Sequence, residues 1–489
     1  IKTEPLEVKQ AQLTVQASHF VQQIYRTMPP RLGTRRTKLR TTLDAEIQTK
    51  VQTILDRHLK GLKYRQVQQG AALVVDHQTH EVLAWVNAGE VRAGIPGGWI
   101  DAVVSPRQPG STLKPFLYAL ALQRGWTAAT LIEDLPLAEP VGSGLHSFRN
   151  YSRAHYGPLV LRDALGNSLN IPAIRTIQFV GVKDFFNCLM NMGIQSLRQH
   201  PQYYGDGLAL GNGEIRLFEL VQAYCVLAGG GMYHPLKLLL DNSSPPQTPR
   251  KLFSPEVTSI ISNILSDPQA RRLEFGAGSL LNFPVQTAVK TGTSNDYRDA
   301  WAIGYNYRYT IGVWMGNLDH STMSGVTGSS GPALVLRAIF AELNRHQYTR
   351  PLYLSRRLIK VKVCRESGML SMDGCSAYDE WFVPGTEPIA SDARDEPEEI
   401  YHLRRPTPGL HLAMDPRIPD DHEAFSFELA SKPPGAAVQW YVDGELMATT
   451  STAHYLWPLQ RGEHCVQAAV LPRYQNQPIR TPRIDFEVK

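Results

Sequence analysis

The chain has 489 residues, enough for about two to four domains of ordinary size. Hydrophobic residues make up 43 % and charged residues 19 %, a composition typical of globular proteins that argues against a disordered or fibrous chain. Fifty lysines and arginines against 45 acidic residues give a net charge of +5. That bias is too small for a dedicated nucleic-acid-binding protein, so we expect no nucleic-acid partner.

The first part of the sequence predicts a connector over residues 1–65. A helix is expected over 16–26, before a Pro-Pro pair. The basic stretch 31–40 contains no acidic residue. We interpret it as a solvated linker, with contact to anionic lipid or cell-wall polymer as the alternative. A second helix is expected after Asp44, which suits the N-cap position.

The sequence predicts no membrane-spanning helix, because no run of about 18 apolar residues occurs. The chain opens with Ile1 rather than Met. We therefore expect a processed or truncated piece of a longer protein, with any export signal or membrane anchor upstream.

Strand patterns on both sides of a helical region predict an α+β domain over residues 66–345. Residues 70–86 contain two β-rich runs joined by a polar turn, which is typical of a hairpin. Helical patterns dominate from 111 to 230. Three further strands are expected over 285–289, 300–305 and 309–315. We expect the first and last strands to close one sheet.

The last part of the chain predicts a linker and then a small all-β domain. A Cys-containing segment and a Pro- and acid-rich linker are expected over 346–408, and an immunoglobulin-like β-sandwich over 409–489. The aromatic residues of the sandwich are interpreted as core, with docking of a partner protein as the alternative. They are Trp440, Tyr441, Tyr455 and Trp457.

Two of the five cysteines suggest a cross-link. Cys364 and Cys375 bracket a short turn-rich loop, which a disulfide would close in an oxidising compartment; two free thiols are the alternative. Zinc would need further ligands, and no second cysteine pair or histidine cluster supplies them, so no metal is expected. No cofactor is expected either.

Three short motifs carry the chemistry, and they occur in one order. They are Ser111-Thr112-Leu113-Lys114, Ser168-Leu169-Asn170 and Lys290-Thr291-Gly292-Thr293. The first two patterns arise easily by chance and the third more rarely, and each alone has an ordinary structural interpretation, as a helix cap, a turn or a strand end. Together, in order and with matching local patterns, they predict one nucleophilic active site.

Ser111 and Lys114 have the spacing of a nucleophile and its base. Ser111 follows a Pro-Gly pair and opens an apolar helical pattern, which puts it at a helix N-terminus. Lys114 lies three residues on, on the same face of the first turn. A serine hydroxyl needs a base to take its proton, and a dry, positively charged pocket that includes Lys290 would lower the pKa of Lys114 enough to serve.

The third motif ends a strand-like run. Lys290 is expected to add positive charge, and the hydroxyls of Thr291 and Thr293 to bind a substrate carboxylate. Gly292 would leave room for a ligand backbone to approach the strand edge. The backbone N–H groups of Thr293 and Ser111 are expected to converge as an oxyanion hole.

The second motif lies on a loop between two helical patterns. Ser168 is expected to relay a proton, and Asn170 to bind a substrate peptide group.

These motifs match the S-x-x-K, S-x-N and K-T-G motifs of the penicillin-binding proteins. Over about residues 42–345 the sequence resembles the class A, bifunctional members. The tail is similar to the small C-terminal module of the penicillin-binding protein 1C type, and the segment around Cys364 and Cys375 also resembles that family. Asp299 and Trp301, which follow the third motif, are expected to be structural.

The resemblance implies a fold like that of serine β-lactamases and a D,D-transpeptidase reaction. Ser111 would attack the penultimate D-Ala carbonyl of a peptidoglycan stem peptide, and an amine from a neighbouring stem would then take the acyl group. β-Lactams would acylate the same serine. The resemblance also implies a periplasmic protein anchored in the bacterial inner membrane, with a glycosyltransferase domain ahead of the transpeptidase region. Residues 1–40 are too few to contain that domain.

Three alternatives remain open. A β-lactamase shares the motifs but needs a Glu-positioned water, which nothing in the sequence identifies. A D,D-carboxypeptidase uses the same acylation with water as acceptor. A penicillin-binding scaffold would turn over slowly and act by docking a periplasmic partner through residues 409–489.

Overall fold

The computed structural model describes residues 17–27, 39–89, 100–141, 144–240, 248–276, 278–371, 375–388, 401–406, 409–412, 414, 424–430, 432, 436–471 and 478–489. The chain divides into two compact units, Ile1–Ile389 and Ala390–Lys489. The basic residues 31–38 and the acidic stretch 391–399 lie outside the described residues, so their interpretation as linkers stays a prediction.

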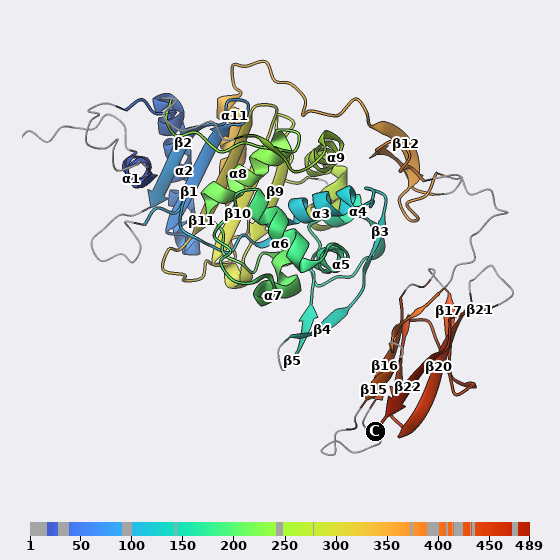
Figure 1. Cartoon of the computed structure of the whole chain (residues 1–489). Helices are drawn as coiled ribbons and strands as arrows, with labels where there is room; N and C mark the ends of the chain where they lie inside the picture. The colour runs from blue at the N-terminus through green and yellow to red at the C-terminus, as the bar shows by residue number, and fades with distance from the viewer. Residues whose placement is uncertain are drawn as a thin grey trace, which may run out of the picture. The chain divides into compact units, whose positions relative to one another are not determined.

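A five-stranded antiparallel sheet forms the centre of the first unit (Figure 1). Its order is β2 (Glu81–Gly89), β1 (Gln69–Asp76), β11 (Tyr309–Gly316), β10 (Asp299–Tyr305) and β9 (Ala288–Thr293). The expected closure between first and last strands is confirmed, because β1 pairs with β11 over its whole length. The strand expected over 285–289 instead covers 288–293, so the third motif itself pairs with β10.

One face of this sheet is covered by α2 (Ala45–Leu62) and α11 (Pro332–Leu343). Asp44 caps α2 as expected, accepting from the N–H groups of Glu46 and Ile47 at 2.9 Å. Val51, Leu55 and Leu59 of α2 share a core with α11. The expected connector over 1–65 is therefore wrong for α2, because its apolar stripe is part of the domain core.

The helix α1 (Ser18–Thr27) also belongs to the first unit. Its Phe20 is buried, and its ring lies 5.9 Å from the ring of Trp85 on β2. This contact, too, places part of the expected connector in the domain.

Helices cover the other face of the sheet, where the alternate side chains of β1, such as Leu73 and Val75, are buried. The longer ones are α3 (Lys114–Gln123), α5 (Asn170–Val180), α6 (Val182–Asn191), α8 (Leu217–Ala228) and α9 (Pro255–Ser266). The shorter ones are α4 (Leu161–Gly166) and α7 (Pro201–Tyr204), whereas Phe275 of α10 (Arg272–Phe275) packs against the core that α2 and α11 share. This confirms the predicted helical region and the α+β class.

Four two-stranded pairs complete the described part of the first unit. They are β3 (Leu131–Asp134) with β6 (Gly157–Val160), β4 (Leu137–Val141) with β5 (Gly144–Phe148), β7 (Met232–Tyr233) with β8 (Arg250–Lys251), and β12 (Ile359–Cys364) with β13 (Ala377–Phe382). Val363 and Phe382 of the last pair form a small core with Ala129. The β12–β13 hairpin, which contains most of the expected Cys-containing segment, is therefore a packed part of the first unit.

The second unit contains two sheets. One contains β14 (Leu403–Arg405), β16 (Ala424–Leu429) and β19 (His454–Pro458). The other contains β15 (Leu410–Leu412), β22 (Ile484–Val488), β20 (Gly462–Leu471), β17 (Ala437–Val442), β18 (Glu445–Thr450) and β21 (Ile479–Arg480). The ring of Phe427 lies within 6.3 Å of those of Trp440 and Trp457 in a shared core, as expected for a sandwich.

The sandwich begins before the expected boundary at residue 409. Tyr401 and Leu403 of its first strand region are buried in its core. Trp440 and Trp457 are buried, which confirms the core interpretation for both, and Tyr441 and Tyr455 are half-buried. Within the described ranges, no helix combines the length and the hydropathy that crossing a bilayer requires.

Candidate active site

The first motif forms a tight turn at the start of α3. A 3-10 helix, η2 (Gly110–Leu113), leads directly into α3 at Lys114. Gly110 has a φ of +55°, and a Cβ there would lie 2.7 Å from the carbonyl oxygen of Thr293. Only glycine lets the turn pack this closely on β9. Ser111 is half-exposed, and its first-turn N–H has no acceptor within the helix.

Lys114 is fully buried and faces the second motif. Its Nζ donates to the carbonyl oxygens of Ser168 at 2.6 Å and Leu169 at 2.9 Å, and to Oδ1 of Asn170 at 2.7 Å. Burial and, next, the positive charge of Lys290 lower the pKa of Lys114 well below its usual range. The hydrogen bonds therefore hold the amine in a fixed place, and burial makes its neutral form less costly to reach than in water, as a general base requires.

The second motif follows the short helix α4. Ser168 has a φ of +61°, and its N–H donates to the carbonyl of Leu165 at 3.0 Å. Oδ1 of Asn150 accepts the backbone N–H of Asn170 at 2.8 Å. Nδ2 of Asn170 donates to the carbonyl of Arg149 at 2.8 Å. These contacts turn the Ser168 loop toward Lys114.

Lys290 of β9 completes the cluster. Its Nζ donates to Oγ of Ser168 at 2.7 Å and to the carbonyl of Thr291 at 2.9 Å. Burial and the nearby positive charge of Arg271 lower the pKa of Lys290 to about 7. The structure thus brings Lys114, Ser168, Asn170 and Lys290 together through direct hydrogen bonds.

Gly292 is required for a different reason from the one expected. A Cβ there would lie 2.3 Å from the carbonyl oxygen of Pro109 and 2.8 Å from Cγ2 of Thr112. The space beside Gly292 is therefore filled by the turn that carries Ser111, not left open for a ligand. Thr291 is buried, whereas Thr293 is half-buried and its Oγ1 accepts the N–H of Gly328 at 3.1 Å.

Asp299 and Trp301 are structural, as expected. Both are buried. Oδ1 of Asp299 accepts the indole N–H of Trp314 at 2.9 Å, and Nε1 of Trp301 donates to the carbonyl of Gln108 at 2.7 Å. The second bond fixes the chain two residues before Gly110.

Sequence reasoning missed several residues around the motifs. Oε1 of Glu274 accepts from Ser152 at 2.6 Å and from Tyr156 at 2.9 Å, and its backbone N–H donates to Oδ1 of Asn167 at 2.9 Å. The charge of Glu274 opposes the lowering of the Lys114 pKa. These residues come from loops and short helices whose pattern carries no signal beyond that of a turn.

The structure contains no disulfide between Cys364 and Cys375, although the sequence led us to expect one. Sγ of Cys364 instead donates to Oε2 of Glu366 at 3.0 Å. The two sulfurs and the Glu366 carboxylate lie within 4.8 Å of one another, so Glu366 is a third potential ligand that the sequence reasoning overlooked.

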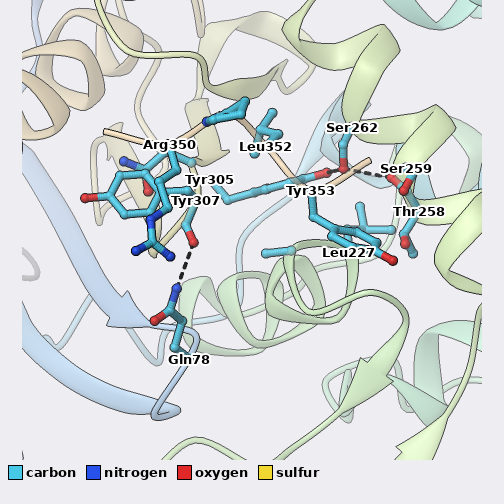
Figure 2. Close-up of a pocket in the computed structure, with 13 residues that line it drawn as sticks. Gln78, Leu227, Thr258, Ser259, Ser262, Tyr305, Tyr307, Arg350, Leu352 and Tyr353 are labelled. Atoms are coloured by element: carbon cyan, nitrogen blue, oxygen red, sulfur yellow. Dashed lines mark hydrogen bonds between the residues drawn. The ribbon is translucent and has the colours of Figure 1, made fainter. Parts of the chain in front are cut away.

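A cavity of about 300 Å³ lies away from the motifs (Figure 2). The end of α8, the middle of α9, the β10–β11 turn and residues 350–353 line it. Tyr305 and Ser262 share a hydrogen bond of 2.8 Å in its wall, and Gln78 donates to the carbonyl of Tyr307 at 3.1 Å. No motif residue lines it.

Solved structures with the same fold include two penicillin-binding proteins. The crystal structure of penicillin-binding protein 1A from Haemophilus influenzae aligns with a TM-score of 0.66 and 18 % identity, over 79 % of this chain and 78 % of that one. The structure of PonA1 from Mycobacterium tuberculosis in complex with penicillin V aligns with a TM-score of 0.57 and 19 % identity, over 69 % of this chain and 94 % of that one. At these identities the likeness shows the fold alone.

Sequence relatives include two longer proteins. Penicillin-binding protein 1C of Escherichia coli (strain K12) is 34 % identical over 309 residues, which are 62 % of this chain and 38 % of the relative. Penicillin-binding protein 1A of Clostridium botulinum (strain Langeland) is 29 % identical over 390 residues, 73 % of this chain and 46 % of the relative. The chain thus spans less than half the length of these relatives.

Family comparison covers most of the first unit. The penicillin-binding protein transpeptidase domain matches residues 70–340, and the C-terminal domain of penicillin-binding protein 1A matches residues 356–395. The first match includes all three motifs and more than half of the chain. The chain therefore belongs to the penicillin-binding protein transpeptidase family.

Proposed function

We propose that the chain cross-links peptidoglycan stem peptides by D,D-transpeptidation through an acyl-enzyme on Ser111. The buried cluster in which Lys114 and Lys290 both contact Ser168 carries this proposal. It supplies a base, a proton relay and a positive charge beside a half-exposed serine, the set that acyl transfer needs.

In the first half-reaction, Oγ of Ser111 attacks the penultimate D-Ala carbonyl, and its proton passes to the neutral amine of Lys114. The backbone N–H groups of Ser111 and Thr293 stabilise the oxyanion. When the C–N bond breaks, the proton that Lys114 took from Ser111 passes by way of the Ser168 hydroxyl to the departing nitrogen. The terminal D-Ala leaves, and the amine of Lys114 is neutral again. Lys290, Thr291 and Thr293 hold its carboxylate, and Asn170 holds a peptide group of the stem.

In the second half-reaction, an amine of a neighbouring stem attacks the ester carbonyl and gives up a proton to Lys114. The ester bond breaks and the proton returns to Oγ of Ser111, so a new amide forms with no net use of water. With a β-lactam only the acylation step takes place: Oγ of Ser111 attacks the lactam carbonyl, the lactam C–N bond opens, and the acyl group stays on Ser111. We place this chemistry on the periplasmic face of a bacterial inner membrane, with the membrane anchor and a glycosyltransferase domain in the longer native protein.

The scaffold alternative gains no support from the second unit. Trp440 and Trp457, two of the aromatic residues considered for docking, are buried in the sandwich core.

The test is incubation with a stem peptide ending in D-Ala-D-Ala and an acceptor amine, with mass spectrometry of the products. We expect released D-Ala and a cross-linked peptide with the wild type and neither with S111A. D379N, which alters an exposed residue, should react like the wild type. Hydrolysed donor alone would indicate a D,D-carboxypeptidase, and no product at all would overturn the proposal.

A further inference from the structure

We propose that the β12–β13 hairpin is a positioning part of the active site. In this inference, Glu380 and Arg365 hold helix α4, and α4 in turn sets Ser168. The inference rests on the proposed role of Ser168 as proton relay. The hairpin lies beyond residues 70–340, the part of the chain that matches the transpeptidase domain.

Glu380 of β13 makes a buried, two-pronged ion pair with the second residue of α4. Its Oε2 accepts Nε of Arg162 at 2.6 Å, and its Oε1 accepts Nη2 at 2.5 Å. Glu380 is 0 % and Arg162 is 3 % exposed. Such a pair fixes both orientation and distance, and the loss of one partner leaves the other charge buried without its counter-charge.

A second pair lies beside the first. Nη1 of Arg365 donates to both carboxylate oxygens of Asp163, at 2.6 and 2.7 Å. Three residues after Arg365, Gly368 packs closely against Ala129: a Cβ on Gly368 would lie 2.1 Å from the carbonyl oxygen of Ala129. The hairpin thus holds two consecutive residues of α4.

Helix α4 in turn positions the loop that carries Ser168, because this loop begins within one turn of the helix end. The N–H groups of Ser168 and Leu169 donate to the carbonyls of Leu165 and Ala164 at 3.0 and 3.1 Å. On its other side, α4 packs against residue 270, where a Cβ on Gly166 would lie 2.2 Å from the carbonyl oxygen of Ala270. The position of α4 therefore fixes where Ser168 meets Lys114 and Lys290.

Arg162 also connects the hairpin to the surroundings of Lys290, through the end of helix α9. Arg162 donates to Oδ2 of Asp267 at 3.1 Å and to Oδ1 of Asn263 at 2.7 Å, at the end of α9. Four residues on, Arg271 donates to the carbonyls of Leu265 and Leu281 and contributes to the lowered pKa of Lys290. The hairpin is thus linked to both partners of the Lys290–Ser168 bond.

The chain offers a matched control within the hairpin. Lys360 and Asp379 also form an ion pair, at 2.7 Å, but their side chains are 50 % and 48 % exposed. Exposed pairs of this kind contribute little to stability. D379N and E380Q therefore remove neighbouring carboxylate charges from one strand, and only E380Q disturbs α4.

The experiment measures acylation by fluorescent penicillin, separated into the dissociation constant of the non-covalent complex and the maximal acylation rate. For E380Q we expect the maximal rate to fall about tenfold to a hundredfold, the cost of a displaced catalytic group. The dissociation constant should stay within about twofold of the wild-type value, because the pair does not touch the ligand. D379N should match the wild type in both.

A double-variant cycle separates positioning from general loss of stability. If Glu380 acts through Ser168, E380Q should cause no further loss of maximal rate in an S168A background. An equal loss in both backgrounds, or an E380Q rate equal to that of D379N, would overturn the inference. If E380Q does not fold, R365Q, which removes the partly exposed second pair, decides the same question by the same criteria.

Hydrogen exchange tests the coupling between the hairpin and the Ser168 loop independently of the proposed function. The amides of residues 165–169 should exchange faster in E380Q than in D379N, whether or not the protein reacts with penicillin. Absence of wild-type acylation would overturn the proposed function, and equal exchange in the two variants would overturn the coupling.

Discussion

The Nζ of Lys290 donates to the Oγ of Ser168 at 2.7 Å, although the two residues lie 122 positions apart in the sequence. The same residue, Ser168, gives its carbonyl to Lys114. Ser168 is thus the meeting point of the three motifs, and its left-handed backbone shows how strongly the surroundings fix it.

Replacing Ser168 separates its chemical role from its backbone conformation. In S168A and S168G the relay hydroxyl is lost, so we expect the acylation rate to fall about 10²- to 10⁴-fold in both. S168G should unfold with a free energy about 1 kcal/mol larger than S168A, because glycine tolerates a φ of +61° without strain. Stopped-flow acylation and urea denaturation check the two effects. Acylation of both variants at the wild-type rate would contradict the relay.

Gly292 should not tolerate a side chain. In G292A the added Cβ would meet the carbonyl oxygen of Pro109 at 2.3 Å and push the Ser111 turn off β9. We expect a loss of about 1–3 kcal/mol in the free energy of unfolding, together with slower acylation. G61A is the control, since a Cβ at Gly61 on α2 meets nothing within 4 Å. Wild-type stability and acylation in G292A would show that the turn does not depend on this close approach.

Stability should depend on pH through Lys290. Its pKa is about 7 in the folded protein, whereas an ordinary lysine side chain has a pKa of 10.5, so between these pH values the unfolded chain binds more protons. The free energy of unfolding should therefore rise as pH increases above 7, by up to about 1.4 kcal/mol per pH unit from this group. Urea denaturation at pH 6.5, 7.5 and 8.5 should show a steeper rise for the wild type than for K290M. Parallel curves would contradict the lowered pKa.

The pair of cysteines near Glu366, Cys364 and Cys375, gives a redox prediction. Since both sulfurs lie within a 4.8 Å cluster, mild oxidation should join Cys364 to Cys375. Thiol titration of the denatured protein should then fall from five reactive groups to three. C375S should show no loss of Cys364 reactivity under the same treatment. Five reactive thiols in the oxidised wild type would rule out this pairing.

The motif residues could be predicted because each carries a local signal. Ser111 opens an apolar helical pattern after a Pro-Gly pair, and Lys290 ends a strand pattern, so their backbone surroundings follow from nearby residues. The core sheet could be predicted for the same reason. The need for a small residue at position 292 was also visible, but not that Pro109 and Thr112 fill the space beside it.

The support around the motifs could not be predicted, because it depends on pairs far apart in the sequence. Arg162 and Glu380 are separated by 218 positions, and neither belongs to a periodic or motif pattern. The amphipathic pattern of α2 predicts the helix itself, but its partner α11 begins only at Pro332, so nothing near α2 in the sequence distinguishes a helix of the domain core from a connector. Tertiary contacts of this kind set the domain boundaries.

The most direct test is mass spectrometry of the intact protein after incubation with a β-lactam, followed over hours and mapped to a peptide. The account predicts one covalent adduct, on the peptide that contains Ser111, stable in the wild type and absent from S111A. An unlabelled wild type, or a labelled S111A, would contradict the assignment of Ser111 as the nucleophile.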